Sequence, residues 1–296
     1  MTVLKNAFTV DFEDWFQGIE LDPATWEACE DRLAVGTLRL LDLLGEANVR
    51  ATFFILGSAA ATAPDLVKEI ATKGHEIGSH GYGHEFVYLL GKEAFREDLE
   101  KSLEILDRLV SQPVRGYRAP YFSITPGCEW AFDEMAACGL SYDSSVFPVQ
   151  NYRYGDPLAP RWLHERGSGI TELPPSTWRC AGRNIPVAGG AYFRIFPYTL
   201  TRFGLLKANS AGHPAVFYIH PWELDPQHPR VPVPRRVAVT HYWNLRATEP
   251  RLRRLLADMP FASAAEVIEQ VGQFQGPTHL PGPDGSRVGG SGPLTG

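Results

Sequence analysis

The sequence lacks any segment that would carry the chain across or into a membrane. Its first residues, Met-Thr-Val-Leu-Lys-Asn, do not form the basic region and apolar run of a secretory leader. No run of about eighteen apolar residues, the length that a membrane-spanning helix needs, occurs in the chain. We therefore expect a cytoplasmic protein with no transmembrane segment.

Cysteine and clustered positive charge are also scarce. The 4 cysteines include no Cys-x-x-Cys pair, so zinc-finger spacing is absent, and we expect all four thiols to be reduced and buried. The chain has 28 Lys and Arg against 34 Asp and Glu, a formal net charge of −6, and no basic run. This balance argues against a nucleic-acid partner. The cysteines are Cys29, Cys128, Cys138 and Cys180.

What the sequence does contain is the composition and periodicity of a large α/β protein. Of its 296 residues, 44% are hydrophobic and 21% charged, which suits a soluble globular chain with a substantial core. Short apolar runs alternate with segments of helical spacing, and this alternation predicts a parallel sheet with crossover helices. We expect strands at 8–12, 51–56, 75–79, 114–117, 140–144, 171–173 and 215–219. We expect helices at 33–47, 64–73, 92–109, 125–138, 197–208, 249–257 and 264–271.

A pair of histidines follows the strand expected at 75–79. His80 and His84 are four residues apart in a glycine-rich stretch, which predicts a tight turn that carries both rings. Two imidazoles are half of a metal site, and a catalytic site commonly has a third protein ligand and one open position. Acids after the first expected strand could complete the set, although the same residues could equally be loop histidines and solvated carboxylates. These acids are Asp11, Glu13 and Asp14.

Other polar residues also stand where expected strands end. Arg118 follows the strand at 114–117, Asp143 lies in the strand at 140–144, and His220 follows the last strand. In α/β barrels the active site lies at the carboxyl ends of the strands. We therefore expect these residues, the histidine pair and the N-terminal acids to meet at one rim.

Six short stretches together resemble a known family. They are 9–14 (Thr-Val-Asp-Phe-Glu-Asp), 79–84 (Ser-His-Gly-Tyr-Gly-His), 118–121 (Arg-Ala-Pro-Tyr), 188–194 (Ala-Gly-Gly-Ala-Tyr-Phe-Arg), 217–220 (Phe-Tyr-Ile-His) and 220–223 (His-Pro-Trp-Glu). With them the chain, from about 8 to about 271, resembles the NodB-homology polysaccharide deacetylases, carbohydrate esterase family four. The branch it most resembles is that of deacetylases associated with exosortase-type (PEP-CTERM) exopolysaccharide loci.

The resemblance implies a distorted (β/α) barrel over 1–275, with a C-terminal helical extension from about 223. Residues 276–296, rich in Gly, Pro and Ser, are expected to be a disordered tail. It further implies one divalent metal, Zn²⁺ in the first place with Co²⁺ or Mn²⁺ as alternatives.

Site residues are carried over by their match to the family motifs. The resemblance implies that His80 and His84 are metal ligands, that Asp11 is the general base and Arg118 its orienting partner. It also implies that the Tyr121 N–H binds the oxyanion and that His220 is the general acid.

Two departures from the family pattern leave parts of this assignment open. Phe12 separates two acids that are adjacent in the family, so the third metal ligand is either Asp14, which we prefer, or Glu13. The usual fourth motif is not visible, so the partner of His220 is undetermined, with Asp143 in about the right region.

The implied function is hydrolysis of N-acetyl groups on the N-acetylhexosamine units of a polysaccharide or oligosaccharide, with release of acetate. The alternatives are an allantoinase-like amidohydrolase on the same barrel and a non-catalytic carbohydrate-binding protein. Aromatic residues near the motifs suit sugar binding, although aromatic side chains are also common in cores. The substrate-binding candidates are Trp15, Tyr82, Trp178, Tyr192 and Trp222.

Overall fold

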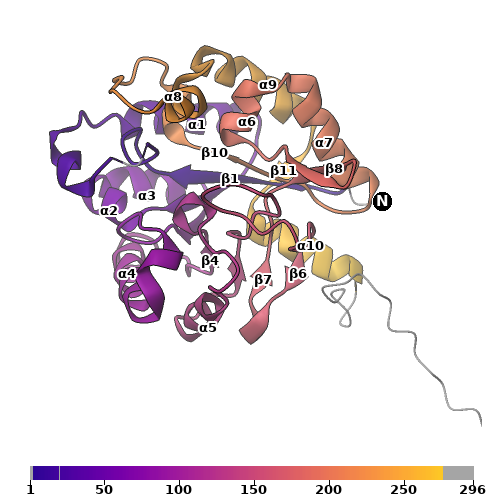
Figure 1. Cartoon of the computed structure of the whole chain (residues 1–296), viewed down its shortest axis with the longest axis horizontal. Helices are drawn as coiled ribbons and strands as arrows, with labels where there is room; N and C mark the ends of the chain where they lie inside the picture. Colours follow the sequence, from indigo (N-terminus) through magenta and orange to yellow (C-terminus); the bar gives the residue numbers. More distant parts are fainter. Residues whose placement is uncertain (1–2, 20, 276–296) are drawn as a thin grey trace, which may run out of the picture.

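The computed structural model describes residues 3–19 and 21–275 and has an α/β fold, a curled parallel sheet surrounded by helices (Figure 1). The strands of the sheet are Asn6–Phe12 (β1), Thr52–Ile55 (β2), Glu76–Ser79 (β3), Gly116–Tyr117 (β4), Tyr142–Asp143 (β5), His164–Glu165 (β6), Thr171–Glu172 (β7), Val216–Ile219 (β10) and Phe261–Ala262 (β11). Their order is β10-β1-β2-β3-β4-β5-β7-β6, with β11 beside β1. Among the described strand pairs of this sheet, β6 and β7 are antiparallel and the others are parallel. The predicted α/β class and distorted barrel are confirmed.

The sheet closes on itself without a regular strand. Past β7 the chain approaches the free edge of β10: the Ser176 N–H donates to the Val216 carbonyl at 3.2 Å, and the Tyr218 N–H donates to the Ala188 carbonyl at 2.7 Å. The next residue, Gly189, has φ 137°, and a Cβ there would lie 1.8 Å from the Tyr218 carbonyl oxygen, so only glycine fits. This irregular closure is the distortion of the barrel.

Helices occupy the connections between strands, and α4 and α5 lie on the opposite side of β1 from α7 and α9 (Figure 1). The α-helices are Leu33–Glu46 (α1), Gly57–Thr62 (α2), Pro64–Thr72 (α3), Val87–Leu109 (α4), Trp130–Ala137 (α5), Gly190–Ile195 (α6), Tyr198–Ser210 (α7), Arg235–Tyr242 (α8), Thr248–Asp258 (α9) and Ala264–Gln275 (α10). Short 3₁₀ turns are Pro23–Ala28 (η1), Pro120–Phe122 (η2), Gly167–Gly169 (η3), Pro221–Leu224 (η4) and Leu245–Ala247 (η5). Within the described ranges, none of these helices combines the length and apolarity that crossing a membrane requires.

The central strands are buried on both faces, as their apolar sequences predicted. Every residue of β1, β2 and β10 is buried. The Phe8 ring packs 5.4 Å from Phe217 and 5.6 Å from Phe261, measured between ring centroids. Burial of each such ring contributes about 1.5–3 kcal/mol, so these strands form a rigid base for the polar residues at their carboxyl ends.

Each expected helix and strand has a counterpart, with local corrections. Helix α4 is interrupted at Gly91 (φ 74°), so its long regular part starts at Lys92 as expected. Helix α5 starts at Trp130 rather than near Thr125, because Gly127 adopts φ 98° and the chain turns there first.

Other features were missed or only partly anticipated. A hairpin, Thr177–Cys180 (β8) and Arg183–Pro186 (β9), turns through Ala181 and Gly182, both with positive φ; such turns are usually signalled by Asn-Gly or Asp-Gly. The cysteines are free as expected, but of the four only Cys128 is buried. The expected disordered tail, 276–296, lies outside the described residues.

Candidate active site

Three buried side chains meet where β1 and β3 end. The ligand atoms of Glu13, His80 and His84 lie within 4.8 Å of one another. Glu13 Oε2 is 2.5 Å from His84 Nε2 and 3.8 Å from His80 Nε2. One carboxylate and two imidazoles are a donor set that binds zinc and similar divalent metals.

The environment of the two histidines fits a cation. The Arg118 carbonyl holds His80 Nδ1 at 2.7 Å, which directs Nε2 toward Glu13, a common arrangement behind ligating histidines. Burial lowers the pKa of His80 to about 4, so its ring is neutral and has a free lone pair. His84 Nδ1 is buried without a hydrogen-bond partner in the described structure, and the His84 contact inside the cluster is that of Nε2 with Glu13 Oε2, the two atoms that a cation would bind together.

The turn that carries the histidines is anchored from α4. Asp98 accepts hydrogen bonds from the Tyr82 and Gly83 N–H groups, each at 2.7 Å. His84 itself has φ 58°, a conformation uncommon for a side-chain-bearing residue. The Tyr121 ring packs edge-on against His84 at 4.5 Å and completes its surroundings.

The carboxylate beside the histidines is Glu13, and our preference for Asp14 is corrected. Asp14 Oδ1 accepts from the Trp15 N–H and Oδ2 from the Arg32 N–H, both at 2.7 Å, so this side chain anchors the segment before α1. Burial raises the pKa of Asp14 to about 7 despite these hydrogen bonds. Strand periodicity could have distinguished the two acids, because Asp11 and Glu13 are two residues apart and share a face while Asp14 faces the other way.

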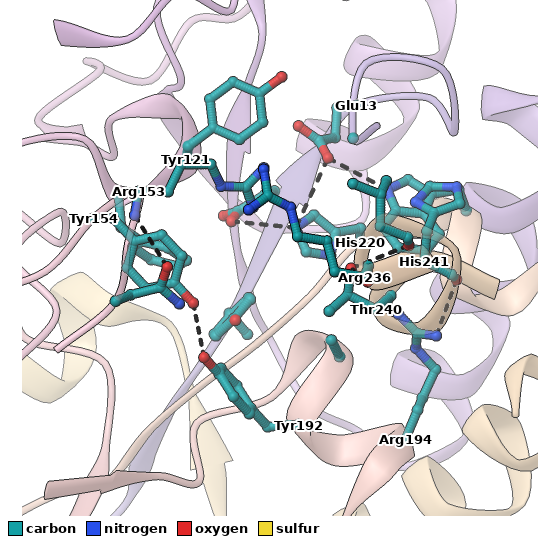
Figure 2. Close-up of a pocket in the computed structure, with 18 of the residues that line it drawn as sticks. Glu13, Tyr121, Arg153, Tyr154, Tyr192, Arg194, His220, Arg236, Thr240 and His241 are labelled. Carbon is teal, nitrogen blue, oxygen red and sulfur yellow. Dashed lines mark hydrogen bonds and ion pairs between the residues drawn. The ribbon is translucent and has the colours of Figure 1, made fainter. Parts of the chain in front are cut away.

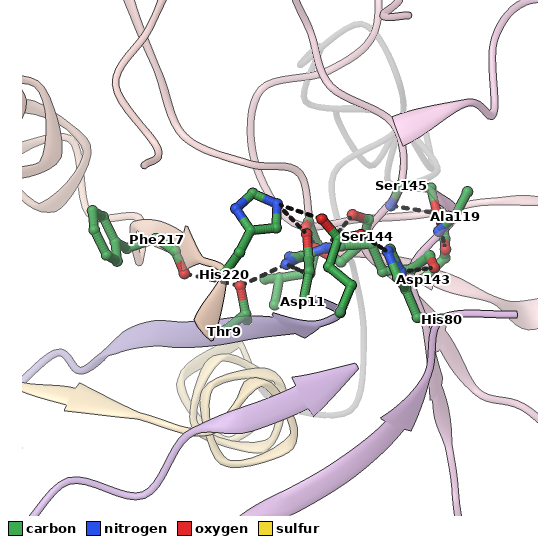
Figure 3. Close-up of polar contacts among 12 residues, drawn as sticks. Thr9, Asp11, His80, Ala119, Asp143, Ser144, Ser145, Phe217 and His220 are labelled. Carbon is green, nitrogen blue, oxygen red and sulfur yellow. Dashed lines mark hydrogen bonds and ion pairs between the residues drawn. The ribbon is translucent and has the colours of Figure 1, made fainter. Parts of the chain in front are cut away.

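Asp11 lies beside this centre and is held by a buried arginine. Arg118 Nη1 donates to Asp11 Oδ1 and to Thr9 Oγ1, each at 2.7 Å, and Nη2 donates to Ser144 Oγ at 2.7 Å. Figure 3 labels the three acceptor residues. The guanidinium is fully buried, so these contacts fix it and in turn fix Asp11. Asp11 Oδ2 stays on the side of His220, whose Nε2 is 3.8 Å away.

His220 has a partner that the sequence reading did not identify. Its Nδ1 lies 2.8 Å from Glu223 Oε1, and Glu223 Oε2 accepts from Arg194 Nε at 2.6 Å. Arg194 also donates to the backbone carbonyls at the end of α8 (Figure 2), those of Thr240, His241 and Trp243, at 2.6–3.0 Å. Pro221 and Glu223 occupy the first and third positions of η4, a sequence signature of a capped turn that could have revealed this pair.

Electrostatics around His220 favour its protonated form. Burial lowers the pKa of His220, but the hydrogen bond to Glu223 and the negative charges of Glu13, Glu223 and Asp11 outweigh burial and raise it to about 9. A divalent cation beside Glu13 would oppose part of this rise. Burial also raises the pKa of Glu13, yet His84, His220 and His80 hold it well below its usual range.

Asp143, the earlier candidate for this partner, lies elsewhere in the network. Its carboxylate accepts from the Ser145 hydroxyl at 2.5 Å and the Ser145 N–H at 3.0 Å. Burial raises the pKa of both Asp143 and its neighbour Glu172, and the charge of Asp143 raises that of Glu172 further. Asp143 thus supports the segment under Arg118, and Glu223 is the partner of His220.

A pocket opens onto the cation-binding cluster and its neighbours (Figure 2). Asp11, Glu13, His80, His84 and His220 line it, and so does Tyr121. Tyr121 has φ 56°, and within the described residues its N–H has no hydrogen-bond acceptor, so this donor is available to a ligand.

The structure brings only two of the five aromatic candidates to this pocket. Tyr192 and Trp222 line it, whereas Trp15, Tyr82 and Trp178 do not. Trp15 is 1% exposed and packs in a core cluster, and the Lys101 ammonium lies 3.5 Å from the Tyr82 ring centroid. Trp178 packs against Phe203 at 5.1 Å. Burial depends on tertiary contacts, so proximity to a motif in sequence could not separate these rings.

Two family descriptions match different parts of the chain. Residues 25–138 match the family described as "Polysaccharide deacetylase", and residues 144–269 match "Domain of unknown function (DUF3473)". A peptidoglycan-N-acetylglucosamine deacetylase of Bacillus cereus is 38% identical over 99 residues, 33% of this chain and 36% of the relative. A chitin deacetylase of Colletotrichum lindemuthianum is 33% identical over 126 residues, 41% of this chain and 50% of the relative. The chain thus spans between a third and a half of these relatives.

The fold has a counterpart among solved structures. A crystal structure from Mycobacterium smegmatis, whose polysaccharide deacetylase assignment is itself provisional, superposes with a TM-score of 0.62 over 95% of both chains at 23% identity. At that identity the likeness concerns the fold. The family match over 25–138 and the curated relatives thus show that part of this chain is similar to polysaccharide deacetylases.

Proposed function

We propose that the protein is a metal-dependent hydrolase that removes N-acetyl groups from N-acetylhexosamine units of a polysaccharide and releases acetate. The observation that carries this proposal is the placement of Asp11 and His220 beside the Glu13–His80–His84 cluster in one pocket. A base, an acid and a cation-binding set within reach of one substrate bond are the groups that amide hydrolysis needs.

Zn²⁺ is the metal we propose, with Co²⁺ or Mn²⁺ as alternatives, because two imidazoles and one carboxylate suit these ions. A bound divalent cation at this set polarises the amide carbonyl and lowers the pKa of water. Glu13, His80 and His84 would hold it.

The surrounding residues have distinct roles in the proposed reaction. Asp11, oriented by Arg118 at 2.7 Å, accepts the proton of the attacking water. The Tyr121 N–H stabilises the negative charge that develops on the carbonyl oxygen, a contact typically worth about 3–4 kcal/mol.

His220 completes the reaction by donating a proton to the leaving amine, which is too basic to leave as an anion. With Nδ1 bonded to Glu223, its Nε2 faces Asp11 and Glu13, so the proton to be donated lies on the pocket side. The products are acetate and a free amine on the sugar.

An exopolysaccharide is the polymer we propose as substrate. What supports this is that two stretches behind the resemblance to exopolysaccharide deacetylases, 188–194 and 220–223, are joined by the buried Arg194–Glu223 ion pair beside the site. A cytoplasmic location stays a prediction.

The test is acetate release from chitohexaose by the zinc-loaded protein, before and after chelation, with His80→Ala beside the control His213→Ala, which lies outside the pocket lining. We expect turnover that requires metal and His80 but not His213. Full turnover after chelation would favour the allantoinase-like amidohydrolase. Glycan binding without acetate release, unchanged in His80→Ala, would favour the carbohydrate-binding protein.

A further inference from the structure

The pocket has a cationic side chain that the proposed chemistry does not use. Arg236, in the first turn of α8, lines the pocket and extends from α8 toward Tyr121 (Figure 2). It is exposed, and no carboxylate among residues 3–19 and 21–275 forms an ion pair with it. Its guanidinium carbon lies 4.2 Å from the ring centroid of Tyr152, another pocket residue.

The stability of α8 does not account for a cation at this position. The N-terminus of a helix carries partial positive charge, so Arg236 in the first turn is unfavourable by about 0.3–1 kcal/mol. Stacking on Tyr152, which is 64% exposed, stabilises the position of Arg236 by about 0.5–1 kcal/mol at such a site. Stacking occupies one face of the guanidinium and leaves its in-plane N–H donors able to bind a ligand.

The carboxylates near the pocket are already compensated by other groups. Asp11 is paired with Arg118, and Glu223 lies between Arg194 and His220. Glu13 belongs to the cation-binding set. With a divalent cation bound, the described part of the pocket therefore carries net positive charge, and Arg236 adds to it at the outer wall.

A second arginine also lies at this wall of the pocket. Arg153 also lines the pocket, and its guanidinium carbon lies 5.1 Å from the Tyr121 ring centroid and 5.7 Å from that of Tyr152. Two guanidinium groups thus lie near the Tyr152 ring at the pocket wall. A planar guanidinium group such as that of Arg236, beside an N-acetyl site, matches a carboxylate, which it binds through paired N–H···O contacts.

We propose that the glycan is anionic, and that Arg236 binds a sugar carboxylate next to the N-acetylated unit undergoing reaction. This inference rests on the proposed deacetylase function and specifies its substrate class. Arg236 acts as a specificity residue and takes no part in the bond-breaking steps.

The test compares hyaluronan and heparosan oligosaccharides, which alternate N-acetylglucosamine with glucuronic acid, with the same oligosaccharides after reduction of their carboxyl groups to alcohols. Acetate release by the zinc-loaded protein gives kcat/KM for each, and calorimetry gives the affinity. We expect about tenfold preference for at least one anionic glycan over its reduced form, a typical size for one charge-assisted contact near solvent. The preference should decrease with added salt.

Arg236→Gln is the informative variant, and Arg235→Gln is its matched control, because Arg235 is exposed on the same turn but does not line the pocket. We expect the preference to fall to near unity in Arg236→Gln and to persist in Arg235→Gln. Equal kcat/KM on both members of each pair by the wild type would overturn the inference and leave deacetylation intact. If neither glycan releases acetate, the protein does not deacetylate these glycans. The affinities for the anionic and the carboxyl-reduced forms, measured by calorimetry, then test the inference on their own. Equal affinities would then overturn it.

Discussion

Replacing Glu223 with glutamine tests the assignment of its role most directly. The carboxylate accepts from three groups: Arg194 Nε at 2.6 Å, His220 Nδ1 at 2.8 Å and the His220 N–H at 3.1 Å. In Glu223→Gln one oxygen becomes an NH₂ group, so a donor must face either Arg194 or His220. Loss of the charge leaves Arg194 buried without its carboxylate, and breaking such a pair typically costs about 3–5 kcal/mol.

The same change has a predictable pH signature. The pKa of His220 is raised to about 9 in the folded protein without metal, against a usual value of 6.5. A raised histidine pKa stabilises the fold fully below pH 6.5, and this contribution is lost as pH rises through 9. The difference corresponds to about 3 kcal/mol, of which Glu223 supplies a part. We expect the gap in unfolding free energy between metal-free wild type and Glu223→Gln to be widest at acidic pH and to narrow toward pH 9.

Activity should change in the same direction. In the zinc-loaded enzyme we expect kcat to fall by about 100-fold, the usual scale for a misplaced general acid. The alkaline limb of the pH–rate profile should move to lower pH, because the acid now deprotonates more easily. Glu134→Gln is the control, since Glu134 is also buried between two cationic partners, Lys92 and Arg96, but lies outside the pocket lining. An unmoved alkaline limb in a destabilised Glu223→Gln would refute the role assigned to Glu223.

Three further outcomes follow from the structure. Glu13→Gln should lower zinc affinity by more than about 100-fold and Asp14→Asn should not, as measured by metal content after dialysis. Gly36→Ala should destabilise the protein by about 1–3 kcal/mol in urea unfolding, because its Cβ would lie 1.9 Å from a backbone oxygen of η4. Burial raises the pKa of Glu172, so the folded protein keeps a proton on this carboxyl group that the unfolded chain releases above pH 4.5. The free energy of unfolding therefore falls as pH rises above 4.5. Glu172→Gln should remove this loss, about 1.4 kcal/mol per pH unit between the unfolded and folded pKa values; the same loss in the variant would contradict the assignment to Glu172 and place the proton on Asp143.

The rim of the barrel was predictable because it depends only on the alternation of strands and helices along the sequence. Apolar runs separated by helical segments place the carboxyl ends of parallel strands at one edge. This rule brought Asp11, His80, Arg118 and His220 together from the sequence. In the structure Asp11, His80 and His220 line one pocket, and Arg118 is paired with Asp11.

Other parts of the site depend on features that alternation does not encode. Choosing Glu13 over Asp14 requires knowing how the chain runs just past Phe12, where β1 ends and the Glu13 N–H donates to the Asp11 carbonyl at 3.1 Å. The pairing of Glu223 with Arg194 joins residues 29 positions apart in segments whose mutual packing no local pattern specifies. The burial of Trp15 is likewise a tertiary property.

The pocket takes residues from both matched regions, so these two regions must fold together. His80, His84 and Tyr121 lie in the segment that matches the deacetylase family, whereas His220 and its partner Glu223 lie in the segment of unknown function. The sheet joins these segments to the N-terminal strand, because β10 pairs with β1 and β1 pairs with β2. Removal of 144–269 would therefore take away both the acid and a strand that covers the buried edge of β1. In this chain residues 144–269 contribute His220, its partner Glu223 and the α8 side of the pocket.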